Sequence, residues 1–164
     1  MKSVIAVRHS KSSWGDSNLD DFERPLNERG KREAPEMARR LASRGIQPDY
    51  FLSSSAKRAR KTAIAFAEEL NFPKERIELK RELYLASAQE MFAAIAKCPE
   101  STDTVIFFSH NPGITEFVNR LTSVRTDNMP TSAIFAVSSA CNDWPSFELA
   151  AKEFLFFDYP KAGI

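Results

Sequence analysis

Two histidines in the 164-residue sequence are the first candidates for chemistry, because each follows a short apolar run. His9 comes shortly after residues 4–7, and His110 comes shortly after residues 105–108. Continuous apolar runs of this length are typical of strands buried on both faces of a parallel sheet. Since sites in open parallel sheets form outside the carboxyl ends of the strands, we expect both imidazoles at the same edge.

Two arginines are expected at this edge as well. Arg8 directly precedes His9, and Arg58 lies in the first turn of a helix expected after a strand at residues 50–52. A guanidinium group binds phosphate oxygens through a planar fork, and a neutral imidazole can attack phosphorus to form a covalent phosphohistidine. A second imidazole can donate to a phosphoryl oxygen. The set of four favours phosphoryl chemistry, although a single strand-end histidine is more often structural and Arg58 alone also fits a solvated helix face.

The other patterns predict helices between the strands. Asn27 is a candidate cap for a helix that ends near Gly45. Pro35 lies inside this helix and indicates either a kink or a later start. Further helices are expected to begin at three points: after residues 53–55, at the capping box of Ser87 and Glu90, and at Asn111 with Pro112 in the first helical position.

Two strand patterns near the carboxyl terminus, residues 133–137 and 147–157, predict a hairpin that turns near residues 142–143. Strands that alternate with helices indicate an α/β sheet with helices on both faces. No repeat or linker composition interrupts the pattern. We therefore expect one domain over residues 1–164, with a three-layer α/β/α architecture and a mostly parallel central sheet.

The segments that carry these residues resemble a known family. Residues 7–10, Val-Arg-His-Ser, resemble the Arg-His-Gly signature of the histidine phosphatase superfamily, which has the phosphoglycerate-mutase-like fold. Residues 54–59 resemble its second phosphate-binding arginine motif, and residues 109–112 resemble its second-histidine motif. Residues 24–27 and 131–134 resemble the small SixA-type phosphohistidine phosphatases. The resemblance runs along nearly the whole chain in matching order.

This resemblance implies roles for individual residues. His9 would be the phosphorylated nucleophile, and three further residues would form the phosphate pocket: Arg8, Arg58 and His110. The sequence departs from the family pattern at two places. Ser10 stands where the family usually has glycine after the nucleophile, and Ser55 stands where proline is common in the second motif.

A proton donor for the leaving group is a separate question. Larger members of the superfamily use a carboxylate, and Glu82 lies where the chain is expected to return to the pocket after a weak edge-strand pattern. A simple ion pair with Lys80 or Arg81 explains Glu82 equally well. Asp16 and Asp20 in the long first loop are weaker candidates. A phosphoramidate substrate also needs such an acid less, because the leaving imidazole can take its proton from solvent.

Composition narrows the partners and the compartment. The 23 basic and 22 acidic residues give a net charge of +1, which offers no reason to expect nucleic acid or a membrane as a partner. Cys98 and Cys141 form no metal or redox spacing, and the amino terminus does not resemble a signal peptide, so we expect a cytoplasmic protein. The glycines form no nucleotide-binding loop and the histidines lack metal-ligand spacing, so no cofactor or metal is expected.

These expectations converge on a phosphatase that works through a phosphohistidine intermediate on His9. The SixA-type resemblance implies a phosphohistidine protein as substrate, bound in an open groove. A small phosphate ester is the alternative, in a broad phosphomonoesterase, and a phosphate-binding module without turnover is an alternative of another class. A mutase is disfavoured, because it must keep water away from its phosphorylated intermediate. The sequence does not predict the oligomeric state.

Overall fold

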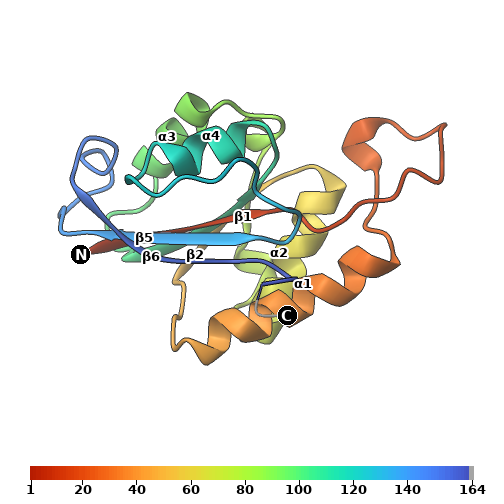
Figure 1. The fold of residues 1–164 in the computed structure, drawn as a ribbon, viewed down its shortest axis with the longest axis horizontal. Helices are drawn as coiled ribbons and strands as arrows, with labels where there is room; N and C mark the ends of the chain where they lie inside the picture. The colour runs from red at the N-terminus through yellow and green to blue at the C-terminus, as the bar shows by residue number, and fades with distance from the viewer. Residues whose placement is uncertain (163–164) are drawn as a thin grey trace.

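The computed structural model describes residues 1–162 and contains one six-stranded sheet, with the strand order β3-β2-β4-β1-β5-β6 (Figure 1). The first four strands in sequence run parallel to one another, whereas β5 is antiparallel to β1, and β6 is antiparallel to β5. The α/β class with a mostly parallel sheet is therefore confirmed. The strands are β1 (Lys2–Arg8), β2 (Tyr50–Ser54), β3 (Glu78–Lys80), β4 (Thr104–Ser109), β5 (Ile134–Ser139) and β6 (Lys152–Asp158).

Helices cover both faces of this sheet and make three layers (Figure 1). Side chains of β1 alternate between two cores, as the pleat of a strand requires. Ile5 and Val7 pack with α1 (Glu28–Ser43) and α2 (Lys57–Glu69), whereas Val4 and Ala6 pack with α3 (Ala88–Ala96) and α4 (Gly113–Asn119). Three short 3-10 helices complete the set: η1 (Asp21–Glu23), η2 (Lys74–Arg76) and η3 (Arg81–Leu83).

The first helix begins where its cap predicts. The side chain of Asn27 accepts a hydrogen bond from the backbone N–H of Gly30, and α1 runs from Glu28 through Pro35. The expectation of a later start at the proline is therefore wrong. A proline inside a helix costs about 3 kcal/mol. The fully buried side chains of Met37 and Leu41 on the same helix offset that cost, at about 1.5–3 kcal/mol for each.

The start of α4 also differs from the expectation. Pro112 occupies the cap position and the helix begins at Gly113. The Asn111 side chain does not cap the helix, because its amide donates to Asn128 and its oxygen accepts from Thr115. A Cβ atom at Gly113 would lie 1.8 Å from the backbone oxygen of Ala86, just before α3, so only glycine permits this close packing at the start of α4.

The carboxyl-terminal hairpin is confirmed, with a later second strand than expected. β5 pairs with β6 in antiparallel register, but β6 begins at Lys152. Residues 147–151 belong to the connecting loop, where Phe147 is fully buried together with Trp144. Phe147 therefore packs into the core from the loop, whereas Leu149 in the same run is 94% exposed, so this run does not extend the strand. Across residues 1–162, no helix is long and apolar enough to cross a bilayer.

Candidate active site

The two imidazoles meet because of the register between β1 and β4. These strands are parallel neighbours, and Arg8 lies opposite Ser109 in the ladder. His9 is therefore the first residue after β1, and His110 is the first residue after β4. Their ring centroids are 5.1 Å apart, which is close to the spacing of adjacent strands. Both side chains are buried, His9 with 6% and His110 with 1% of its surface exposed.

A third strand end supplies the second arginine. β2 lies on the other side of β4, and the hydroxyl of its last residue, Ser54, is 2.8 Å from Nε2 of His110. The chain then enters α2, whose first turn contains the buried Arg58. One cavity of about 190 Å³ is lined by all four side chains that the sequence singles out, Arg8, His9, Arg58 and His110. The structure thus brings these four residues together.

Unpaired polar atoms show what this cavity is built to hold. Within residues 1–162, four buried side-chain nitrogens have no hydrogen-bond partner, and all four belong to residues that line this cavity. A buried donor without an acceptor costs about 1–3 kcal/mol. Four such atoms around one space indicate a ligand with several acceptor oxygens. The atoms are Nε of Arg8, Nη1 of Arg24, Nε of Arg58 and Nδ1 of His110.

The hydrogen bond of His9 identifies its reactive nitrogen. Nδ1 lies 2.7 Å from the carbonyl oxygen of Ser10, and a carbonyl can only accept, so Nδ1 carries the proton. Nε2 is then left with the lone pair. Burial, His110 and the two arginines Arg8 and Arg58 hold the pKa of His9 well below its usual value, although the Ser10 carbonyl acts in the opposite direction. The ring is therefore neutral at neutral pH, and a neutral imidazole with a free lone pair can act as a nucleophile.

The second imidazole is neutral for a similar reason. Burial and the nearby Arg58 lower the pKa of His110 to about 3. The Ser54 hydroxyl accepts from the backbone N–H of Ala56 and is free to donate its own proton to Nε2 of His110. In that arrangement Nδ1 of His110, which is buried and has no partner within residues 1–162, carries a proton. A neutral imidazole with this tautomer can donate to a phosphoryl oxygen.

A carboxylate that sequence reasoning missed holds the arginines in place. Asp21 in η1 accepts from Nη2 of Arg58 at 3.0 Å, from Nε of Arg24 at 3.1 Å and from the Tyr84 hydroxyl at 2.5 Å. Its backbone oxygen also accepts from Nη1 of Arg58 at 2.7 Å. Asp21 and Arg24 are three residues apart, and this spacing could have predicted the ion pair between them. Nothing in the sequence indicates that the same carboxylate reaches Arg58.

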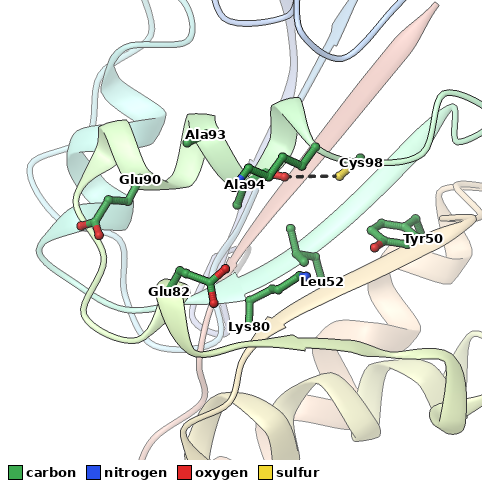
Figure 2. Close-up of a pocket in the computed structure, with 9 residues that line it drawn as sticks. Tyr50, Leu52, Lys80, Glu82, Glu90, Ala93, Ala94 and Cys98 are labelled. Carbon is green, nitrogen blue, oxygen red and sulfur yellow. Dashed lines mark hydrogen bonds between the residues drawn. The ribbon is translucent and has the colours of Figure 1, made fainter.

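Glu82 does not reach this site. It is exposed and lines a different cavity, of about 240 Å³, together with Lys80 and Leu52 below α3 (Figure 2). The chain does return to the site as expected, but it does so two residues later. The ring of Tyr84 lies 5.5 Å from that of His110. The geometry therefore does not support Glu82 as the proton donor, and Asp16 and Asp20 do not line the histidine cavity either.

Comparisons with known proteins agree with this geometry. A crystal structure from Agrobacterium tumefaciens, provisionally described as the phosphohistidine phosphatase SixA, superposes with a TM-score of 0.80 at 26% identity, covering 97% of this chain and 98% of that one. The protein histidine phosphatase SixA complexed with tungstate gives a TM-score of 0.77, also at 26% identity, over 94% and 95% of the two chains.

Sequence similarity extends to a longer protein, of which this chain spans little more than half. An uncharacterised chloroplastic protein of Arabidopsis thaliana is 30% identical over 126 residues, which are 72% of this chain and 58% of that protein. The sequence pattern of the histidine phosphatase superfamily (branch 1) matches residues 4–127, which include both histidines and all three arginines that line the cavity. The chain therefore belongs to the histidine phosphatase superfamily, branch 1.

Proposed function

We propose that the protein is a phosphatase that passes a phosphoryl group through a covalent phosphohistidine on His9, and that its substrate is a phosphohistidine side chain of a protein. The observation that carries this proposal is the set of four unpaired, buried nitrogens around the cavity that holds His9. A tetrahedral anion offers the acceptor oxygens that such donors lack. Membership of the superfamily supports the same reaction.

In the first step, the lone pair on Nε2 of His9 attacks phosphorus. The bond between phosphorus and the leaving nitrogen breaks, and the leaving imidazole keeps that electron pair and takes a proton from solvent. Arg8 and Arg58 neutralise the charge on the phosphoryl oxygens. The His9 ring becomes cationic, and the Ser10 carbonyl, which accepts from Nδ1–H, stabilises that charge.

In the second step, a water oxygen attacks the phosphorus of phosphorylated His9. The bond to Nε2 breaks, the electron pair returns to the ring, and the surplus proton of water passes to solvent. Inorganic phosphate then leaves. His110 faces the same group and donates from Nδ1 to a phosphoryl oxygen, which stabilises the charge that develops there in both steps.

The state of the nearest carboxylate favours a phosphoramidate over an ester. Burial raises the pKa of Asp21, but the hydrogen bonds from Tyr84 and Arg58 outweigh this, and the net shift is below the usual value. An ionised carboxylate that already accepts from two arginines is a poor proton donor. A leaving imidazole tolerates this lack better than a leaving alkoxide, because its nitrogen is readily protonated by solvent.

The size of the cavity favours a side chain of a protein. Pockets that enclose a drug-sized ligand usually measure about 300–1,000 Å³. At about 190 Å³, this cavity has room for a phosphoryl group and the ring that carries it, and the rest of the substrate must lie outside. A phosphorylated side chain on a protein surface meets this requirement.

Three substrates distinguish the proposal from its alternatives: a phosphohistidine protein, a phosphoserine peptide and an aryl phosphate. We expect release of phosphate to be fastest from the phosphohistidine protein, and a quenched reaction to show acid-labile, base-stable phosphate on His9. Hydrolysis of the esters alone would indicate a phosphomonoesterase. Binding of phosphate without turnover of any substrate would indicate a binding module.

The matched variants are His9→Asn and Glu82→Gln. The first removes the nucleophile and should abolish both turnover and the covalent label. The second changes a carboxylate in the other cavity and should leave both unchanged. Full activity in His9→Asn would overturn the mechanism, whatever the substrate.

A further inference from the structure

Arg24 is a buried arginine that reaches the cavity from the loop between β1 and α1. Only 8% of its surface is exposed, and it lines the cavity beside His9. Its Nε donates to Asp21 at 3.1 Å, whereas its Nη1 has no hydrogen-bond partner among residues 1–162. An ion pair with Asp21 accounts for the first nitrogen and leaves the second unexplained.

An indole fixes the plane of this guanidinium group. The central carbon of the Arg24 guanidinium lies 3.5 Å from the ring centroid of Trp14, which is the distance of a stacked cation–π pair. Trp14 is 75% exposed and also lines the cavity. Arg24 is thus held at one nitrogen by Asp21 and on one face by Trp14, while its buried Nη1 has no partner within residues 1–162.

We propose that Arg24 is a third guanidinium that binds the substrate's phosphoryl group directly, through Nη1, and that it makes the cavity selective for the dianionic form of that group. The inference rests on the proposed function in taking a phosphoryl group as the ligand. The unpaired nitrogens of Arg8, at the end of β1, and Arg58, in the first turn of α2, supply two donors. Arg24 supplies another from the loop, and a phosphoryl group has three oxygens to receive them.

The charges around the cavity agree with a preference for two negative charges on the ligand. Three arginines and Lys11 line the cavity, and Asp21 is bonded to two of the arginines. Burial and the nearby cations keep both histidines neutral, so they add no charge. Loss of the Arg24 charge should therefore weaken binding of a dianion more than binding of a monoanion.

Calorimetry with inorganic phosphate tests this inference. A hydrogen bond to a charged group contributes about 1.5–3 kcal/mol, so Arg24→Met should weaken phosphate binding at pH 8 by about 10- to 100-fold. The loss should be smaller at pH 6, where more of the phosphate is the monoanion. A role in loop structure alone would lower both affinities by the same factor, and that result would overturn the proposal, as would an Arg24→Met affinity within about twofold of wild type.

Two further measurements cover a variant that fails to fold. Arg24→Lys keeps the charge but loses the planar fork, so it should bind phosphate with an affinity between those of wild type and Arg24→Met. In the wild-type protein, the guanidinium nitrogen signals of Arg24 should shift in NMR spectra when phosphate is added. Signals that do not move would contradict direct contact.

Arg44 offers the matched control. Its guanidinium carbon lies 3.8 Å from the ring centroid of Phe156, and it is paired with Asp158, so it has the same kinds of contact without lining the cavity. Arg44→Met should bind phosphate as the wild type does. Because phosphate binding needs no turnover, a protein that binds through Arg24 but does not hydrolyse phosphohistidine would overturn only the proposed function.

Discussion

The two sides of the cavity are held in different ways. On the sheet side, backbone hydrogen bonds fix His9, the proposed nucleophile, since the N–H of His9 donates to the carbonyl of Ser109 and that of Arg8 donates to the carbonyl of Ala133. On the loop side, residues 14–20 are all exposed, and side chains hold the arginines in position. Trp14 stacks on Arg24, and Asp21 binds the arginines. From this difference we expect that substitutions at the sheet edge change turnover, whereas substitutions in the loop change mainly the affinity for the ligand.

The base of this loop is nevertheless well defined. Ser12 and Leu26 form an isolated bridge, and the backbone N–H of Asn27 donates to the carbonyl of Lys11. A Cβ atom at Gly30 would lie only 2.1 Å from that same Lys11 oxygen, so a glycine is required where α1 meets the loop. The first turn of α1 therefore closes the loop at its base and leaves its tip accessible.

The largest expected effect is a loss of turnover without a loss of phosphate affinity, on substitution of His9. His9→Asn should reduce turnover by at least about 10⁴-fold, because the lone pair that attacks phosphorus is lost. Phosphate affinity should stay within a few-fold of wild type, since the unpaired nitrogens belong to other residues. Stopped-flow turnover and calorimetry measure the two quantities. A loss of both in a folded variant would show that the two roles are not separated.

The next effect is on stability, because the sheet side buries two neutral imidazoles. Below about pH 6.5 the unfolded chain binds a proton at each histidine, whereas the folded protein does not, since burial lowers both pKa values. The free energy of unfolding should therefore fall as the pH decreases, by at most about 1.4 kcal/mol per pH unit for each histidine.

Denaturant unfolding between pH 6.5 and 5 in phosphate-free buffer measures this slope. The carboxylates titrate mainly below this window, so they add little to it. A variant with His9→Gln and His110→Gln should show a flatter dependence. A wild-type slope of zero would mean that the folded protein protonates its histidines as readily as the unfolded chain.

A smaller effect is expected on the loop side. Trp14→Ala removes the stacking partner of Arg24, and a cation–π contact at an exposed site contributes about 0.5–1 kcal/mol. Phosphate affinity should fall by about two- to fivefold, and Trp14→Phe should restore part of it. Leu19→Ala, on the same loop and also exposed, should have no effect. Equal losses in both variants would mean that the loop acts only through its general shape.

Sequence reasoning succeeds on the sheet side because its rules are local. His9 and His110 each follow an apolar run, and the rule for parallel sheets then predicts that they share an edge. Their pairing at 5.1 Å depends on the strand order and on the register of Arg8 with Ser109. These are set by packing between distant segments, which a pattern in one segment does not contain.

The side-chain positions on the loop side could not be predicted from the sequence, for a physical reason. Residues 10–26 have no hydrophobic period, so nothing in the pattern says which side chain turns inward. Arg24 is buried by Trp14 and Asp21, and Asp21 is placed by Arg58 and Tyr84, which arrive from α2 and from the end of η3. The position of each side chain depends on the others, and the set forms only in the folded protein.

The smallest expected effect is that of a substitution at Glu82, which lies outside the cavity that holds His9. It tests where the site ends. Glu82→Gln should leave turnover and phosphate affinity within about twofold of wild type, since exposed charges outside a site contribute little. The comparison variant is Tyr84→Phe, which removes the hydrogen bond to Asp21 and should raise KM. A large fall in kcat for Glu82→Gln would require the segment around η3 to move during turnover and deliver a carboxylate to the cavity.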